Sequence, residues 1–115
     1  MRTLAIDTEV AGRTAVVALS GEADLYTCPE LKQELLRVVE RGATRVIVDL
    51  TLTTFIDSTA LGVLVRGVER LRQVDGHLVV VCTDPNIAKI FEVTGLDRVF
   101  TVVSTREQGL AQAAL

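Results

Sequence analysis

Short apolar runs alternate with helix-patterned segments along this chain, and this alternation limits the possible folds more than any other feature of the sequence. The run Val46-Ile47-Val48 is β-branched without a break, which is typical of a strand covered on both faces of a sheet. His77–Cys82 has the same character. Because strands that alternate with helices are joined by right-handed crossovers, the pattern predicts a largely parallel sheet with helical cover.

Two segments have clear helical periodicity. The first begins at Thr27, which with Glu30 three residues later forms a capping box, and it runs to about Arg41. In the second, apolar residues at positions 61, 64, 65, 68 and 71 form one stripe, which we expect to face the core. The other positions of this helix, among them Val63 and Gly67, are expected to face outward.

The remaining segments complete the predicted order β-β-α-β-α-β-α-β-α. The sequence therefore predicts one α/β domain over residues 1–115 with a mixed central sheet. We expect strands over 3–9 and 13–19 joined by a hairpin, connections over 20–24 and 51–56, a short helix after Asp84-Pro85, a strand over 99–103, and a terminal helix opened by a capping box at Ser104–Glu107.

The composition favours a protein or a small ligand as the binding partner. Of the 115 residues 49% are hydrophobic but only 3% are aromatic, so the core has to be aliphatic and wide stacking surfaces for nucleic acid are missing. The net charge is −3 and the basic residues are scattered, which argues against contact with DNA, RNA or an anionic membrane. The longest apolar run, Leu78–Cys82, is far shorter than the roughly 18 residues needed to span a bilayer.

The two cysteines indicate a reducing compartment. Cys28 and Cys82 are far apart and match no metal-binding or redox spacing. A strand-like pattern follows Arg2 directly, so no signal peptide is expected. We therefore expect reduced thiols in a cytoplasmic protein.

The stretch from Phe55 to Gly62 is the strongest candidate for function. It opens the second helix, so Asp57 and Ser58 fall at a helix N-terminus, where free N–H groups and the helix dipole favour a carboxylate or a phosphate. Only one of these two residues can be the N-cap, and the side chain of the other is then free. On residue type alone, a plain cap and a functional hydroxyl are equally good interpretations of Ser58.

No catalytic, metal-binding or cofactor motif accompanies this serine. His77 is the only histidine and lies at a predicted strand start, and the chain has no Gly-x-Ser-x-Gly elbow and no phosphate-binding glycine loop. Asp24, Asp49 and Asp57 can converge at one edge of the sheet, but dispersed carboxylates are more often solvated or capping than metal ligands. The sequence therefore predicts no catalytic residue, no metal and no cofactor, and Ser58 becomes a candidate substrate for another protein.

Three segments together resemble one known family over nearly the whole chain. The chain resembles the STAS domain, as found in bacterial anti-sigma factor antagonists. This resemblance implies a single STAS-like domain with a mixed sheet. The matching segments are Val48-Asp49-Leu50 through Phe55–Leu64, Gly21–Asp24 with Thr27, Pro29, Glu30 and Leu31, and Thr94-Gly95-Leu96 with Val99-Phe100.

The resemblance also implies a mechanism. In the family, the serine that Ser58 matches is phosphorylated by a partner anti-sigma factor that is also a serine kinase, and a phosphatase resets it. The unphosphorylated antagonist binds the anti-sigma factor and frees the sigma factor. Thr59 leaves a second hydroxyl beside Ser58 and is the second candidate for phosphorylation.

The partner surface is expected to surround the serine and to follow the outward face of the second helix. The alternative is a STAS module that serves as a fixed, unphosphorylated subunit of a larger regulatory or transport complex, because a fold alone does not determine function. The predicted partner contacts are Asp24, Asp57, Ser58, Thr59, Gly62, Val63, Arg66 and Gly67.

Overall fold

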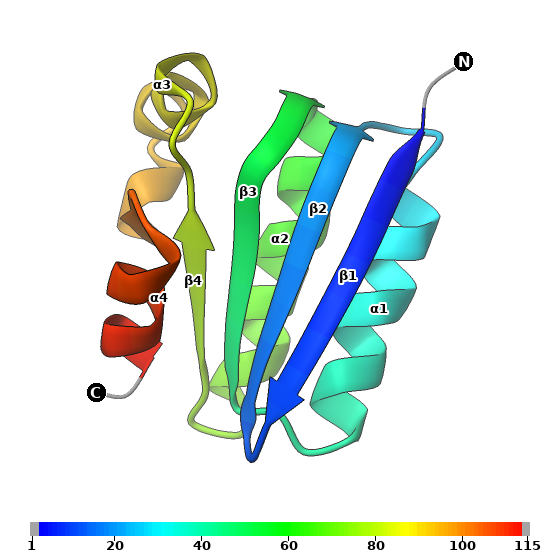
Figure 1. The fold of residues 1–115 in the computed structure, drawn as a ribbon, viewed down its shortest axis with the longest axis vertical. Coiled ribbons are helices and arrows are strands. Elements are labelled where there is room, and N and C mark those ends of the chain that lie inside the picture. The colour runs from blue at the N-terminus through cyan, green and yellow to red at the C-terminus, as the bar shows by residue number, and fades with distance from the viewer. Residues whose placement is uncertain (1–2, 114–115) are drawn as a thin grey trace.

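The computed structural model describes residues 3–113, which form a five-stranded sheet, four α-helices and one 3₁₀ helix (Figure 1). The strands and helices follow the order that the sequence pattern predicts. Their bounds are β1 (Leu4–Ala11), β2 (Thr14–Ala23), α1 (Cys28–Glu40), β3 (Arg45–Ile56), α2 (Ser58–Arg72), β4 (His77–Val81), α3 (Pro85–Val93), η1 (Leu96–Arg98), β5 (Thr101–Val103) and α4 (Arg106–Ala113).

The sheet has the order β1-β2-β3-β4-β5 and is mixed, as predicted. β1 pairs antiparallel with β2 through a tight hairpin at Gly12, whose φ of +62° is one that other residues rarely adopt. The remaining pairings are parallel, and Val48 of β3 lies between Val17 of β2 and Val80 of β4. The carboxyl ends of the parallel strands therefore lie at one edge of the sheet, where open sheets of this kind bind ligands.

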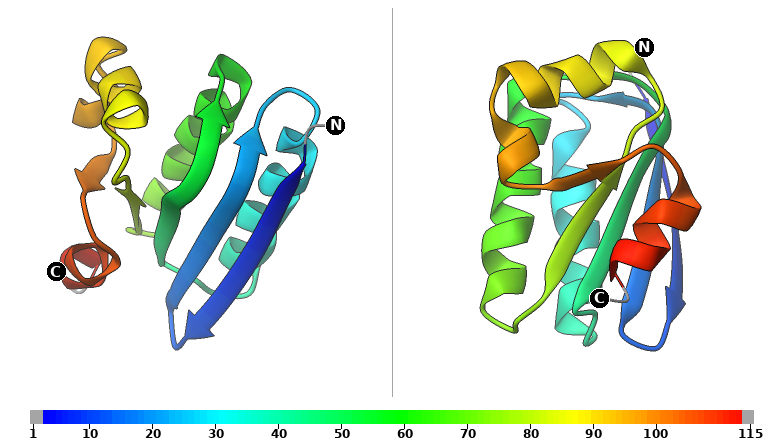
Figure 2. Two further views of the ribbon diagram at one scale, coloured as in Figure 1. Left: turned by 45° about the horizontal axis from the view of Figure 1, so that its top comes forward. Right: turned by 90° about the vertical axis from the view of Figure 1, so that its left-hand side faces the viewer.

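Helices cover the two faces of the sheet unequally. α1 and α2 lie side by side on one face, and α4 lies on the other face against β3 and β4 (Figure 2). Because side chains alternate along a strand, Val46 and Val48 point to the α1 and α2 face, whereas Ile47 points to α4. None of the helices between residues 3 and 113 is long and apolar enough to cross a membrane.

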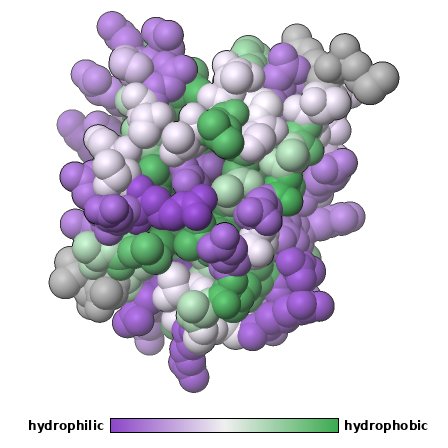
Figure 3. Space-filling model, in the orientation of Figure 1, coloured by the Kyte–Doolittle hydropathy of each residue, from purple (hydrophilic) through white to green (hydrophobic). Residues whose placement is uncertain are grey.

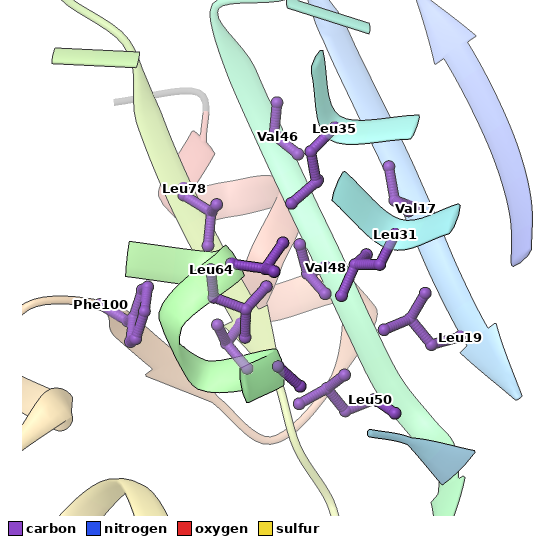
Figure 4. Close-up of a cluster of buried hydrophobic side chains, with 14 of the residues drawn as sticks. Val17, Leu19, Leu31, Leu35, Val46, Val48, Leu50, Leu64, Leu78 and Phe100 are labelled. Atoms are coloured by element: carbon purple, nitrogen blue, oxygen red, sulfur yellow. The ribbon is translucent and has the colours of Figure 1, made fainter. Parts of the chain in front are cut away.

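The main core lies between the sheet and the two helices α1 and α2 (Figure 4). Leu31 of α1 and Leu64 of α2 are fully buried there, together with aliphatic residues of the three central strands. Two aromatic rings join this core, since Phe91 and Phe100 meet edge to face with their centroids 5.7 Å apart. A largely aliphatic core is what the low aromatic content of the sequence predicts.

Two strands are longer than expected. β2 continues through Ala23 and β3 through Ile56, so the predicted connections over 20–24 and 51–56 are wrong. Here two register shifts between β2 and β3 each place one extra residue in β3. Because the shifts and the polar residues interrupt the apolar alternation that marks a strand, the sequence pattern missed these ends.

The predicted capping box at the start of α1 is also wrong. The Thr27 hydroxyl accepts a hydrogen bond from the Asp24 N–H (2.9 Å) and donates to the Glu22 carbonyl (2.8 Å), and it caps no helix N–H. It therefore stabilises the loop before the helix. The side chain of Glu30, the expected partner in the box, is exposed.

A capping box does open α4, but one residue later than predicted. The Thr105 hydroxyl accepts from the Gln108 N–H (3.1 Å), and the Gln108 side-chain oxygen accepts from the Thr105 N–H (3.2 Å). The predicted pair, Ser104 and Glu107, has the same spacing. Since both residue pairs fit the pattern, the sequence alone did not distinguish them.

Candidate functional site

The candidate site lies where β3 ends and α2 begins, at the edge formed by the carboxyl ends of the parallel strands (Figure 1). The loop that joins β2 to α1 lies beside it. The Asp57 N–H donates to the Ala23 carbonyl (3.1 Å), so the two chain segments are in direct contact.

Asp57 is the N-cap of α2. One oxygen of its carboxylate accepts from the Ala60 N–H (3.0 Å), and the other accepts from the Leu25 N–H (3.0 Å). A single carboxylate therefore caps the helix and holds the β2–α1 loop. This arrangement decides between the two candidate caps, because it leaves Ser58 outside the cap.

Ser58 occupies the first position of α2, and its side chain is exposed. Its hydroxyl makes no hydrogen bond to any residue between 3 and 113. Thr59 is half-buried, so of the two adjacent hydroxyls that of Ser58 is the more accessible.

Asp24 has a structural role in the loop. It is only 1% exposed, and its carboxylate accepts from the N–H groups of Tyr26 (2.9 Å) and Thr27 (3.1 Å). The prediction that its side chain lies on the partner surface is therefore corrected. An aspartate that turns its own loop is a frequent role of this residue type, and the sequence pattern does not distinguish it from an exposed contact.

The surroundings of Ser58 are acidic. Residues 22–27 and 51–60 contain three carboxylates and neither lysine nor arginine. Beneath the site, burial together with the charges of Asp57 and Asp24 raises the pKa of the Cys28 thiol to about 11. A phosphate on Ser58 therefore meets negative charge and no basic partner in these two segments.

The outward face of α2 is narrower than predicted. Val63 is 5% exposed, and a Cβ at Gly67 would lie 3.2 Å from the Leu78 side chain and 3.6 Å from that of Leu35. Both positions face inward because α1 packs against this side of α2, so predicting them as exposed is wrong. Of the predicted outward positions toward the middle of the helix, Arg66 is exposed.

A groove of about 300 Å³ separates the outer surfaces of α1 and α2. Val63 lines its wall, and the charged residues that line it are Lys32, Arg66, Glu69 and Arg70. Arg70 also pairs with Glu40 at 3.8 Å. The groove therefore carries a modest excess of positive charge, in contrast to the acidic edge around Ser58.

Asp49 does not join the other two aspartates. It lies in the middle of β3, nearly buried, and pairs with Arg106 of α4 at 3.0 Å. Burial alone would raise the pKa of Asp49, but hydrogen bonds from Thr51 and the charge of Arg106 outweigh this effect and hold the pKa below its usual value.

Within the described range no group of three His, Cys, Asp or Glu side chains is arranged to hold a metal ion. His77 is exposed at the start of β4.

Four large apolar side chains near Ser58 are exposed, and the sequence pattern did not single them out. Two lie in the loop before α1, and two lie in the last five residues of β3. Two of them fall in the expected connection over 51–56, and the other two lie between the expected loop over 20–24 and the expected helix start at Thr27. They are Leu25, Tyr26, Leu52 and Phe55.

The fold and the site together define a small α/β domain with one exposed serine at the carboxyl edge of its sheet. The STAS domain family model matches residues 5–109, and the chain belongs to this family.

Known relatives agree with this assignment. An anti-sigma-B factor antagonist of Staphylococcus aureus is 34% identical over 93 residues, which cover 81% of this chain and 86% of the relative. The crystal structure of an anti-sigma factor antagonist from Mycobacterium paratuberculosis has a TM-score of 0.90 at 28% identity, covering 98% of this chain and 96% of the other. The Bacillus cell fate determinant SpoIIAA in its phosphorylated form has the same fold, with a TM-score of 0.73 at 24% identity and coverage of 94% and 98%.

Proposed function

We propose that this protein is an anti-sigma factor antagonist whose unphosphorylated form binds a cognate anti-sigma factor with serine kinase activity, and so releases the sigma factor. Phosphorylation of Ser58 ends that binding, and a phosphatase restores it. The observation that supports this proposal best is the exposed Ser58 hydroxyl, which has no hydrogen bond within residues 3–113. The names of the relatives point to the same class.

The kinase has to supply the chemistry of the transfer. The Ser58 hydroxyl oxygen forms a bond to the γ-phosphorus of ATP, the bond from that phosphorus to the bridging oxygen breaks, and ADP leaves. The hydroxyl proton passes to a base of the kinase, since the site has no histidine and the Asp57 carboxylate already accepts two hydrogen bonds. The role of this chain is to present the hydroxyl.

Phosphorylation should change the complex and leave the domain folded. The phosphate adds about −1.5 to −2 charge at the N-terminus of α2, where the helix dipole stabilises it by about 0.3 to 1 kcal/mol. In a complex, a partner surface that fits a neutral hydroxyl next to Asp57 meets desolvation and like-charge costs of several kcal/mol. At about 1.4 kcal/mol for each tenfold change, binding weakens by about a hundredfold or more.

Mass spectrometry after incubation with the purified kinase and ATP tests the site. We expect one phosphate on Ser58 in the wild type and in Thr59→Ala, and none in Ser58→Ala. Ser58→Ala should bind the partner whether or not ATP is present, and Ser58→Glu should bind weakly. Tight binding by Ser58→Glu would refute the switch and favour the alternative of a fixed structural subunit.

A further inference from the structure

Four exposed apolar side chains, Leu25, Tyr26, Leu52 and Phe55, form a surface that we call the apolar rim. Their exposed fractions are 61%, 80%, 67% and 42%, in that order. Two come from the loop held by Asp57 and two from the strand that leads to it, and exposed apolar side chains of this size are typical of a protein contact surface.

The register of the sheet places two members of the rim on the same face. Leu52 lies beside Ser20 and Phe55 beside Glu22, although Leu52 and Phe55 are three positions apart along β3. Because Ser20 and Glu22 are two residues apart in β2, they share a face, and so do their partners in β3. It is the extra residue in β3 that brings Leu52 and Phe55 together, on the face opposite α1 and α2.

Apolar surface is visible on this side of the molecule. Figure 3 shows the face of the sheet that lies opposite α1 and α2, with hydrophobic areas in green over the upper parts of the central strands. α4 covers the part of this face formed by β3, β4 and β5. The carboxyl end of β3 remains open toward the edge that carries Ser58.

The other two members of the rim are held in place by the site itself. The Leu25 N–H donates to Asp57 and the Tyr26 N–H donates to Asp24. The residue that caps α2 therefore also positions the loop that carries the two most N-terminal side chains of the rim.

We infer that the apolar rim is the surface that anchors the anti-sigma factor kinase, on the sheet side of Ser58. This inference rests on the proposed function. The outward face of α2, which the sequence predicted as the docking surface, lies outside this contact. The partner brings an apolar patch bordered by lysine or arginine.

Charge distinguishes the two candidate faces. The two segments that form the rim contain no basic residue, and two of their three carboxylates, Glu22 and Asp57, are partly exposed, so they attract a basic partner surface. Across α2, the groove is bordered by Lys32, Arg66, Arg70 and Glu69. Arg70 pairs with Glu40 at 3.8 Å, so this face carries a small net positive charge that disfavours the same basic surface. A second copy of this chain would bring its own acidic rim and meet like charge.

Partner binding by matched surface variants tests the inference. We expect Tyr26→Ala and Leu52→Ala each to weaken binding to the purified kinase at least tenfold, measured by isothermal titration calorimetry without ATP. Two control variants, Val93→Ala on α3 and Arg66→Ala on α2, should bind within twofold of the wild type, since Val93 is 74% exposed and belongs to neither of the segments that form the rim. Melting temperatures within about 2 °C of the wild type show that all four variants are folded.

Cross-linking gives a second measurement that does not depend on affinity. A p-benzoylphenylalanine at position 26 should cross-link to the kinase, and one at position 66 should not. If the wild type binds but the rim variants bind equally well, or if only position 66 cross-links, the rim is refuted and the proposed function stands. Failure of the wild type to bind refutes both, and a dimer lost in Leu52→Ala would assign the rim to self-association instead.

Discussion

Replacing Asp57 by alanine should loosen the start of α2 and the loop before α1 together. The carboxylate accepts one hydrogen bond from the Ala60 N–H and one from the Leu25 N–H, both at 3.0 Å. Loss of an N-cap costs about 1 kcal/mol. The bond to Leu25 is exposed, so water replaces it in part and its loss adds about 0.5 to 1 kcal/mol.

We therefore expect Asp57→Ala to lower the free energy of unfolding by about 1.5 to 2 kcal/mol. For a domain of this size, that corresponds to a fall in melting temperature of about 6 to 8 °C. Urea unfolding followed by far-UV circular dichroism at pH 7 measures the first quantity, and thermal scans measure the second. Amide exchange measured by NMR should become faster at both Leu25 and Ala60.

Two matched variants make this test specific. Asp57→Asn keeps a good capping side chain and should lose less than half as much stability as Asp57→Ala. Ser58→Ala should change the stability by no more than about 0.5 kcal/mol, because the hydroxyl makes no hydrogen bond within residues 3–113. A loss below about 0.5 kcal/mol for Asp57→Ala, or faster exchange at Ala60 alone, would refute the idea that one carboxylate joins loop and helix.

Three further predictions concern the scaffold. Gly62→Ala should raise the free energy of unfolding by about 0.5 to 1 kcal/mol, because a Cβ at this position meets open space. Gly67→Ala should be less stable than Gly62→Ala by at least about 0.5 kcal/mol, because its Cβ would lie 3.2 Å from the Leu78 side chain. Parallel urea titrations measure both. Because the pKa of Asp49 is held below its usual value, its contribution to stability is present above about pH 4 and is lost as the pH falls through the folded-state pKa. Thermal scans between about pH 5 and 2 should therefore show a shallower loss of stability for Asp49→Asn than for the wild type, and an equal slope would contradict the role of Arg106. Since Cys28 is 3% exposed and the pKa of its thiol is raised to about 11, iodoacetamide at pH 8 should alkylate it only as fast as the domain opens, and rapid labelling of Cys28 in the folded protein would count against this.

Much of the fold could be predicted because its signals are local. The unbroken β-branched run over 46–48 marked a central strand, and the stripe over 61–71 marked the helix that follows the site. The errors occur where a second element changes the local rule. Val63 is buried because α1 packs beside it, and no spacing within α2 contains that information.

The candidate site was predicted in position but only partly in composition. Asp57 and Ser58 were found because a helix start has a sequence signature. The exposed side chains of Leu52 and Phe55 depend instead on how β3 pairs with β2. Pairing register is a property of two distant segments, so a single segment could not reveal it.

The two extra residues of β3 also set a rule for the length of this part of the chain. From Ala18 to Ala23, β2 advances five residues, while β3 advances seven from Asp49 to Ile56. Substitutions here change the chemistry of the edge, but a deletion outside the two register shifts turns the following side chains of β3 to the opposite face. A deletion at Thr54 instead removes the extra residue of the second shift, so Leu52 and Phe55 become second neighbours and keep their partners Ser20 and Glu22 on one face. Changes of length in this part of β3 should therefore be tolerated at the two shifts and not between them.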